Sequence, residues 1–361
     1  MAGETLRVLR LIHNLGGGGV QKRLLSLLPL LQQDFSLYLV SFQGGRLERD
    51  FRKMVRVEII PRRAKFDPIC IYRLSRFLKE KNIHILHTHT HKPNTTGRIA
   101  GILSGVPVII ANEHNVDSWK GRFQRFLDKT LAKFTDQIIA VSQNVRDFYI
   151  SIGIPPEKIK VIYNGVDLEK FFFHPMRGKG KRVGFVGRLH PQKGIGDLVK
   201  VAERVCREIP EVEFLVCGEG PEENFLKGEV KRRGLEKNFV LMGYQEDMPS
   251  FYGRIDLLLL PSHREGFPNV VLESLASGRP VVATDTGGVR EILGNGKEGY
   301  LVKVGDVEEM SARVIRLLED RKLREEMGKR GRKKAEEFSL RRMAEETRSL
   351  YLDLLEEKKC L

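Results

Sequence analysis

The chain is poor in cysteine and tryptophan and has no long apolar segment. It contains one tryptophan and only four cysteines, which lie far apart and show no metal-ligand spacing: Cys70, Cys206, Cys217 and Cys360. No apolar run approaches the ~20 residues that a membrane-spanning helix needs. The first residues also lack the character of a secretory signal. These absences predict a protein of the reducing cytoplasm, with Cys206 and Cys217 as small core residues.

Positive charge is the main bias in the composition. The 62 Lys and Arg residues outnumber the 47 Asp and Glu residues, which gives a net charge of +15. Such an excess favours an anionic partner: nucleic acid, anionic lipid or a phosphorylated ligand. The chain has no zinc knuckle, no aromatic-rich ribonucleoprotein strand and no repeat code, so we expect no nucleic-acid partner.

Short apolar runs alternate with amphipathic stretches along all 361 residues, a length that suits two domains better than one core. Helical patterns lie between the runs, for instance at 20–32, 71–81 and 197–207. This alternation predicts an α/β protein with parallel sheets covered by helices on both faces. The predicted strands are 6–12, 37–41, 57–60, 83–89, 106–111, 137–141, 160–163, 182–186, 212–217, 239–243, 257–260, 281–284 and 300–302.

A stretch that contains Gly, Pro and Lys separates the two halves. We expect one domain over residues 1–168, a linker over 169–181 and a second domain over 182–335. The chain is mostly helical in pattern after Tyr300. Residues 336–361 are predicted to form a helix that crosses back to the first domain.

The most informative segment is 265–273, Glu-Gly-Phe-Pro-Asn-Val-Val-Leu-Glu. It follows an apolar run, so we expect Glu265 on a loop beyond a strand. Pro268 suits the first turn of a helix, and Glu273 then lies inside that helix. An acid at the carboxyl end of a strand, beside a helix N-terminus, fits a nucleotide-sugar site. The alternative is an ordinary surface loop followed by a charged helix residue.

The same two acids do not fit a glycosidase. They stand eight positions apart, which would span about 12 Å in a helix at about 1.5 Å per residue. The two carboxylates of a retaining glycosidase are about 5–5.5 Å apart, and those of an inverting one about 6.5–9.5 Å. The spacing therefore favours contacts to a ligand over hydrolysis by paired carboxylates.

A phosphate-binding pattern follows the strand predicted at 182–186. Gly187 lets the backbone approach a ligand closely, and Gly194 opens the next helix. Between them, Arg188 can fork onto phosphate oxygens, and Lys193 adds a point charge. Cations preset there would stabilise a nucleoside diphosphate as it leaves. The alternative is that both are solvated surface cations.

The first half has its own glycine-rich turn, Gly16-Gly17-Gly18-Gly19, between a predicted strand and a predicted helix. It is not G-x-G-x-x-G, and no acid follows at the distance typical of dinucleotide binding. Two interpretations stay open: a flexible turn, or a backbone nest that approaches a phosphate or a sugar.

Histidines gather at two predicted strand ends. His87, His89 and His91 alternate as metal ligands can, but no Cys or acid completes a ligand set nearby, so we favour a strand end that lines a cleft. His114 follows the strand predicted at 106–111 and is expected at the carboxyl end of the same sheet. The alternative for His114 is an ordinary loop histidine.

Residues 118–134 combine two side-chain series at helical spacing. One series is Trp119, Phe123, Phe126, Leu127, Thr130 and Phe134, and the other is Arg122, Arg125, Lys129 and Lys133. This segment is either a core-packed helix with a solvated basic side or a helix that rests on anionic lipid. The second interpretation would place the protein on the inner face of the cytoplasmic membrane, close to a lipid-linked acceptor.

Together these residues resemble the retaining, family-4 type glycosyltransferases (glycosyl transferases group 1) of the GT-B fold, in which two Rossmann-like domains face each other across a cleft. The resemblance covers essentially the whole chain. It rests on the order of these motifs: Gly18-Gly19, His87-Thr88-His89, Glu113-His114, Val141-Ser142, Tyr163-Asn164-Gly165-Val166-Asp167, Gly187-Arg188 with Lys193-Gly194, Gly218-Glu219-Gly220-Pro221, Glu265 with Glu273, and Gly287-Gly288-Val289-Arg290-Glu291.

The resemblance implies a UDP- or GDP-linked sugar donor, no metal ion and no other cofactor. Arg188 and Lys193 would hold the donor diphosphate, while Glu265 and His114 would contact the donor sugar. The implied donor-binding residues are Glu273 at the ribose, Tyr244 along the base, and Gly18, Gly19, Gly187, Gly266, Phe267, Asn269 and Val270. Members of the family often carry an acid two residues after the Gly-Gly pair, where this chain has Gln21.

The predicted function is transfer of a hexose, with retention, from a nucleotide sugar to a glycan or glycolipid acceptor in envelope polysaccharide or lipopolysaccharide synthesis. We expect front-face attack, in which the departing diphosphate takes the acceptor's proton. One alternative is a nucleotide-sugar epimerase of the same fold, which acts on the donor alone. The other is a basic membrane- or nucleic-acid-binding protein, which has no use for Glu265 or Glu273.

Overall fold

The computed structural model describes residues 5–175, 181–294 and 296–358, and the chain divides into two compact units. The first unit holds the residues up to Asn164 and those from Leu340 onward, and the second runs from Gly165 to Ser339. The corresponding boundaries predicted from the sequence lie at 168–182 and at 335–336. Residues 176–180 of the predicted linker, the first four residues and Cys360 lie outside the described residues.

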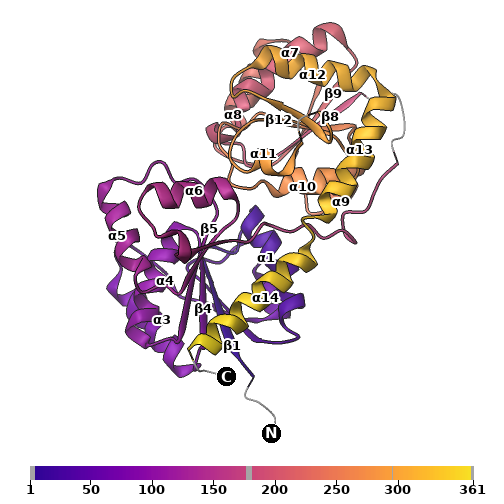
Figure 1. Cartoon of the computed structure of the whole chain (residues 1–361). Coiled ribbons are helices and arrows are strands. Elements are labelled where there is room, and N and C mark those ends of the chain that lie inside the picture. The colour runs from indigo at the N-terminus through magenta and orange to yellow at the C-terminus, as the bar shows by residue number, and fades with distance from the viewer. Residues whose placement is uncertain (1–4, 176–180, 295, 359–361) are drawn as a thin grey trace. The chain divides into compact units, whose positions relative to one another are not determined.

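The first unit is built on a seven-stranded parallel sheet in the order β3-β2-β1-β4-β5-β6-β7 (Figure 1). Its strands are β1 (Arg7–Ile12), β2 (Ser36–Ser41), β3 (Arg56–Ile59), β4 (Ile85–His89), β5 (Val108–Glu113), β6 (Gln137–Ala140) and β7 (Ile159–Val161). Its helices are α1 (Gly19–Leu31), α2 (Glu48–Met54), α3 (Pro68–Glu80), α4 (His91–Ser104), α5 (Arg122–Ala132), α6 (Gln143–Ser151) and α14 (Leu340–Glu357).

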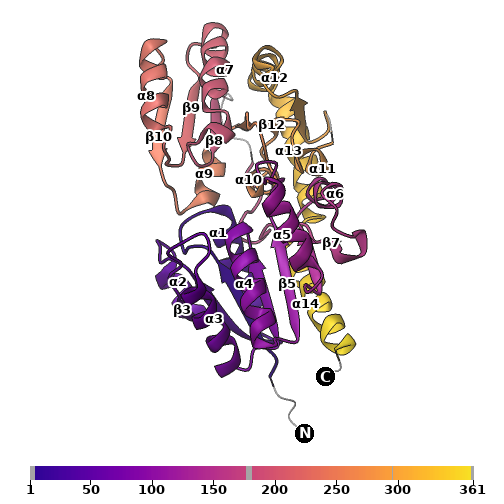
Figure 2. The ribbon, with the colours of Figure 1, turned by 90° about the vertical axis from the view of Figure 1, so that its left-hand side faces the viewer.

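Side chains of this sheet alternate between two apolar layers, as the period of a strand requires. On β1, Val8 and Ile12 pack with residues of α1, α2 and α14. Leu9 and Leu11 point to the other face and pack with α3. Figure 2 shows α3, α4 and α5 side by side on this second face, and α4 contacts both neighbours. Both faces are thus covered, as the sequence predicts for parallel strands.

The second unit contains a six-stranded parallel sheet in the order β10-β9-β8-β11-β12-β13. Its strands are β8 (Arg182–Val186), β9 (Glu213–Cys217), β10 (Phe239–Gly243), β11 (Leu257–Leu260), β12 (Val281–Thr284) and β13 (Gly299–Val302). Its helices are α7 (Ile195–Glu208), α8 (Glu223–Arg232), α9 (Met248–Arg254), α10 (Asn269–Ala276), α11 (Val289–Ile292), α12 (Val307–Glu319) and α13 (Arg321–Glu336).

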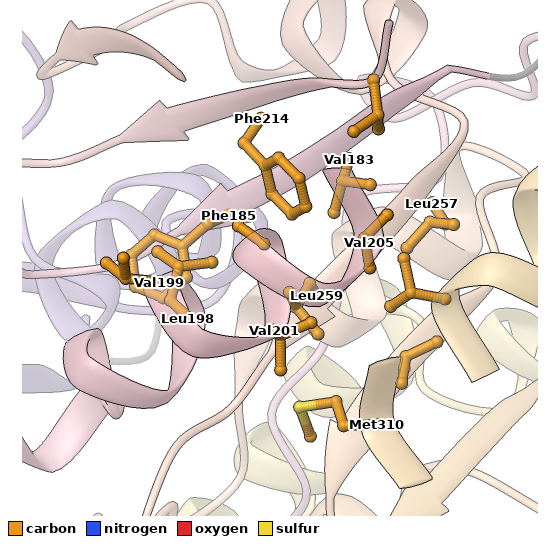
Figure 3. Packing of buried hydrophobic residues seen from close by; sticks show 14 of the residues in the cluster. Val183, Phe185, Leu198, Val199, Val201, Val205, Phe214, Leu257, Leu259 and Met310 are labelled. Carbon is orange, nitrogen blue, oxygen red and sulfur yellow. The ribbon is translucent and has the colours of Figure 1, made fainter. Parts of the chain in front are cut away.

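The core of the second unit lies between its central strands and α7. Figure 3 shows Phe185 and Leu259 from the strands against Val201 and Val205 of α7, with Met310 of α12 closing the layer. All five side chains are buried. The apolar residues of the amphipathic pattern predicted at 197–207 therefore form the buried face of α7.

Local sequence explains where many helices start. Side-chain oxygens accept a bond from a backbone N–H of the first turn, at the N-cap residues Asp67, Ser142, Asp247, Asp306 and Asp320. Three helices near the predicted site residues differ, because α1, α7 and α10 begin after Gly18, Gly194 and Pro268 without a side-chain cap.

The strand order reverses once in each sheet, between β1 and β4 and between β8 and β11. Loops beyond the carboxyl ends of strands on the two sides of such a reversal diverge and leave room for a ligand. The fold thus singles out the loops after β1 and β4 in the first unit and those after β8 and β11 in the second. The predicted α/β fold with two doubly wound parallel sheets is confirmed.

Within the residues described, every helix is too short or too polar to span a lipid bilayer.

The core of the second unit should be sensitive to truncation at Leu259. Leu259→Ala removes a side chain that is fully buried at the centre of the sheet, so we expect it to lower the free energy of unfolding by about 2–5 kcal/mol. Urea unfolding, followed by circular dichroism, measures the change. Val304→Ala removes an exposed side chain and is the control. Equal effects of the two substitutions would contradict this assignment of the core.

Candidate active site

The loops that follow β8 and β11 are held together by hydrogen bonds. The side chain of Gln192 donates to the Arg264 carbonyl over 2.9 Å, and the backbone N–H of His263 donates to the Gln192 carbonyl over 2.8 Å. The His263 ring also lies 2.8 Å from a carboxylate oxygen of Asp197. These two loops flank the reversal of strand order, so their side chains are positioned at the place where the fold predicts a ligand.

Lys193 and Glu265 meet at this place. Lys193 Nζ lies 2.6 Å from Glu265 Oε1, and Glu265 is only 6 % exposed. Each carboxylate or ammonium group lowers the cost of burying the other. Arg188, five residues before Lys193, is exposed and has no hydrogen bond or ion pair among the described residues. The pattern thus presents one paired cation and one cation that is available to an anion.

At two positions of the predicted motifs only glycine fits, because another backbone segment lies too close for a side chain. Gly287 has φ +55°, and a Cβ there would lie 1.7 Å from the Glu265 carbonyl oxygen. The next residue, Gly288, donates from its backbone to the Gly266 carbonyl over 2.8 Å. Gly194 has φ +67°, and its Cβ would meet the Pro261 carbonyl oxygen at 2.0 Å. These contacts fix the backbone that carries Glu265.

Glu273 lies inside α10, as the sequence predicts. The Tyr252 hydroxyl donates to Glu273 Oε2 over 2.9 Å and also lies 3.2 Å from the Val270 carbonyl. Burial, and then the charge of Glu273, raises the pKa of Tyr252 well above its usual value, so this hydroxyl stays protonated. The prediction for Pro268 was wrong in register, because Pro268 is the extended N-cap residue and α10 begins at Asn269.

The remaining predicted donor residues lie on neighbouring loops of the second unit. Phe267 is buried against Phe338, with ring centroids 5.4 Å apart. The backbone N–H of Tyr244, just after β10, lies 3.4 Å from a carboxylate oxygen of Glu219. Gly187 has an ordinary φ and only van der Waals neighbours at 3.6 Å, so here it provides space rather than an unusual conformation.

Gly18, Gly19 and His114 belong to the first unit, so the structure describes them separately from the donor residues. The glycine-rich turn is held by Gln21, whose side chain donates to Asn14 Oδ1 over 2.9 Å and to the Asn14 carbonyl over 3.1 Å. Asn14 Oδ1 accepts in turn from the backbone of Gly16 over 3.0 Å. Gln21, which stands where an acid was expected from the resemblance, therefore fixes the turn.

The histidines form one buried cluster beside this turn. The His87 and His89 rings stack with centroids 4.4 Å apart, and His114 lies against His89 at 5.5 Å. Burial, and then neighbouring cations, lowers the pKa of all three well below the usual value, so they are neutral. His91 points elsewhere and packs on Trp119. In the described part of the chain, no group of His, Cys, Asp and Glu is arranged to hold a metal ion.

Helix α5 begins at Arg122, four residues later than the segment defined from the sequence. Phe123 is 73 % exposed, Phe126 67 % and Trp119 52 %. The interpretation of these aromatic residues as a packed core is therefore wrong. The buried residues of α5 are instead Asp128, Leu131 and Ala132.

A buried ionic cluster anchors this helix. Asp128 lies 2.8 Å from Lys120 and 2.8 Å from Arg98. Burial alone would lower the pKa of Lys120, but the carboxylates of Glu113, Asp128 and Asp117 raise it. Lys120 thus stays charged inside the protein and ties α5 to α4 and to the end of β5. No sequence motif indicated this cluster.

Comparison with known proteins places the chain in a family. Residues 166–334 match Glycosyl transferases group 1, and residues 17–170 match Glycosyltransferase Family 4. Together the two matches span residues 17–334. The chain belongs to this family of glycosyltransferases, as the sequence motifs predicted.

Individual relatives agree with this placement. The chain is 30 % identical to an Escherichia coli UDP-Gal:alpha-D-GlcNAc-diphosphoundecaprenol alpha-1,3-galactosyltransferase, over 94 % of this chain and 95 % of the relative. It is 29 % identical to the Staphylococcus aureus capsular polysaccharide biosynthesis glycosyltransferase CapM, over 91 % and 92 %. The structure of Anabaena HepE with UDP-glucose shares the fold, with a TM-score of 0.85 at 21 % identity, over 99 % and 100 %.

Sequence reasoning missed the residues that support the site. Tyr252 lies in a helix of ordinary composition, and its contact with Glu273 depends on how α9 packs against α10. Gln192 and Asp197 have no motif that marks them. Only the glycines after β12 gave a signal, and their cause, the approach to the Glu265 carbonyl, becomes visible in three dimensions.

The contact at Gly287 predicts a local defect. Gly287→Ala should displace the Glu265 loop, because the methyl group would overlap the Glu265 carbonyl. We expect faster hydrogen exchange over residues 262–268 and a loss of stability beyond the ~1–2 kcal/mol of a left-handed alanine. Gly234→Ala is the matched control, because Gly234 has φ +67° and no atom within 4 Å of a Cβ. Exchange that is unchanged at 262–268 in Gly287→Ala would contradict the predicted displacement.

Proposed function

We propose that the protein is a retaining glycosyltransferase that transfers a hexose from a UDP-sugar to a lipid-linked glycan acceptor of the bacterial envelope. The observation that carries this proposal is the site at the reversal of strand order in the second unit. There Glu265 is buried and paired with Lys193, and Arg188, the residue after Gly187, is exposed. Such a site offers a cation to a diphosphate and a fixed carboxylate to sugar hydroxyls.

Uridine is the proposed donor base. The E. coli relative is named for a UDP-sugar, and HepE was solved with UDP-glucose. In this chain the loop from Tyr244 would lie along the base, with Glu273, held by Tyr252, on the ribose hydroxyls. A carboxylate can accept several hydrogen bonds at once, so the bond from Tyr252 is compatible with bonds from ribose O–H donors.

The proposed reaction is front-face displacement at the anomeric carbon. The acceptor hydroxyl oxygen forms a bond to that carbon while the bond to the diphosphate oxygen breaks on the same face. The hydroxyl proton passes to the departing diphosphate, so the configuration is retained and charge is balanced. Arg188 and Lys193 stabilise the charge that gathers on the leaving oxygens, which is greater in the transition state than in the bound donor.

The acceptor is proposed from the relatives and from the surface of the first unit. The E. coli relative is named for an undecaprenol-linked diphosphate acceptor. Here Phe123 and Phe126 stand out from α5 beside the exposed basic residues Arg122, Arg125 and Lys129. A second exposed apolar group, Phe66, Ile69 and Tyr72, lies at the start of α3. An aromatic and basic surface of this kind fits an anionic lipid surface.

Removal of Arg188 should have a large effect on turnover. Arg188→Ala is expected to lower donor hydrolysis and sugar transfer by about 100-fold or more, because preset charge at a leaving group is commonly worth that much. The assay is slow hydrolysis of UDP-hexoses, which needs no known acceptor. Arg182→Ala is the control: it removes an exposed arginine from the other end of β8, where an ion pair contributes little. Near-normal hydrolysis by Arg188→Ala would refute the assignment.

The exposed aromatic residues should determine membrane binding. We expect the protein to sediment with vesicles that contain acidic phospholipid at low salt, but not with phosphatidylcholine vesicles. The variant Phe123→Ser with Phe126→Ser should lose this binding, because two apolar side chains no longer enter the interface. Phe225→Ser removes an exposed aromatic residue of α8 and is the control. Failure of the unchanged protein to bind acidic vesicles would refute the membrane contact.

A further inference from the structure

Two arginines are buried in the first unit without a carboxylate partner. Arg10, on β1, is 1 % exposed, and Arg23, on α1, is 6 % exposed. Within the part of the chain that the structure describes, no acidic side chain bonds to either guanidinium. Buried charges are normally paired, because an isolated ion loses its hydration without compensation. The pair therefore needs a physical explanation.

The neighbours of the two guanidiniums come from one face of the sheet and from the helices that cover it. Arg10 faces His87 across the β1–β4 ladder, and His87, His89 and His114 follow on the same face by strand alternation. The His87 Nδ1 atom lies 2.6 Å from the Tyr351 hydroxyl of α14, and Arg10 lies over the Tyr351 ring at 5.8 Å.

These groups form a continuous chain of nitrogen–nitrogen contacts. Arg10 Nη1 lies 3.3 Å from His89 Nε2, and His89 Nδ1 lies 3.3 Å from His114 Nε2. His114 Nδ1 then lies 3.4 Å from Arg23 Nη2. The chain thus runs from the fully buried Arg10 to the edge of the cluster, where Arg23 and His114 are the least buried members.

This series of three nitrogen–nitrogen contacts holds one N–H proton more than it can use. Each contact needs a single N–H, but both arginines donate at the ends and each neutral histidine brings one N–H of its own. Arg10 can only donate, so His89 accepts at Nε2 and donates from Nδ1 to His114 Nε2. His114 must then carry its proton on Nδ1, where it faces an N–H of Arg23. Two donors, His114 Nδ1–H and an N–H of Arg23, therefore face each other. Both can form hydrogen bonds if an acceptor from outside this series of contacts binds between them.

Further donors in the cluster also lack acceptors. The Nε atoms of Arg10 and Arg23 and the Nη2 atom of Arg10 are buried without a hydrogen bond, and the nearby acceptor Asn112 Oδ1 bonds to none of them. Burial, and then the Arg10 charge, lowers the pKa of Arg23 to about 9. The cluster is thus a positive, acceptor-poor region that an oxyanion would complete.

We propose that His114 and Arg23 form a two-donor fork for a phosphate group of the substrate, and that Arg10 is a positioning residue that sets the tautomers of His89 and His114. The phosphate oxygen lies where the two donors converge. The inference rests on the proposed function, because a glycosyl transfer of this kind offers two sources of phosphate: the diphosphate of the lipid-linked acceptor and that of the donor.

The first test reads the tautomers directly. In protein labelled with nitrogen-15 at histidine, long-range nitrogen–carbon-bound-proton correlation spectra should show His89 and His114 protonated at Nδ1. Arg10→Lys keeps a donor and should preserve this pattern, whereas Arg10→Met should abolish it. A proton on Nε2 of His114 in the unchanged protein would overturn the proposal, whatever the variants do.

The second test separates the two sources of phosphate. Calorimetric titrations use farnesyl diphosphate as the acceptor-side probe and UDP as the donor-side probe, with farnesol as the comparison that lacks phosphate. Arg23→Gln should weaken at least one phosphate ligand by about tenfold or more, since it removes a charge-assisted bond. A loss with farnesyl diphosphate alone identifies the acceptor phosphate, a loss with UDP alone the donor phosphate, and a loss with both a shared site. All three results support the fork.

The control is Arg7→Gln, which removes an arginine at the opposite end of β1. Unchanged affinities for both phosphate ligands in folded Arg23→Gln would overturn the proposal. That result is distinct from failure of the proposed function, which would appear as absence of UDP binding and UDP-sugar hydrolysis in the unchanged protein. The tautomer measurement and the farnesyl diphosphate titration do not require a ligand at the donor site in the second unit.

Discussion

The candidate site depends on how closely one loop backbone approaches another. The left-handed Gly287 sits against the carbonyl of Glu265, and Gly288 bonds to the carbonyl of Gly266. A side chain at Gly287 could not fit, so the glycine pair decides where the acidic loop lies, and with it the ion pair between Glu265 and Lys193. The loop backbone and the ion pair with Lys193 together hold the carboxylate, which reduces the reorganisation needed when a ligand binds.

The fold was predictable from the sequence because the spacing of apolar residues and the length of the apolar runs are enough to distinguish strands from helices. Each predicted strand appears in one of the two sheets, with ends that differ by at most two residues, since burial and not local sequence decides where pairing stops. The acidic motif and the basic loop were also visible, because glycine and proline mark the chain's turns around them. The roles of Tyr252 and Arg10 were not, because neither residue belongs to a motif and each meets its partner, Glu273 or His89, only through packing of elements that lie apart in the sequence.

Residues 118–134 show why pattern alone left two interpretations open. Aromatic side chains at helical spacing describe a stripe, but they do not say whether the stripe faces the protein or the solvent. The answer came from charged residues: Lys120 and Asp128 form a buried ion pair with Arg98 close by, and this pair turns Phe123 and Phe126 outward. Helix α5 therefore buries the charged Asp128 together with Leu131 and Ala132, while Phe123 and Phe126 stay exposed.

The two units differ in how their sequences are arranged along the chain. The second is one continuous segment, whereas the first closes its core with Leu340, Leu350 and Leu354 from α14, which follows the second unit along the chain. During synthesis on the ribosome, residues up to Asn164 are therefore made well before α14, which completes their core, while the second unit, made in between, can already fold. Until α14 is made, the nascent N-terminal sheet has one apolar face incompletely covered, and transiently exposed apolar surface of this kind promotes aggregation.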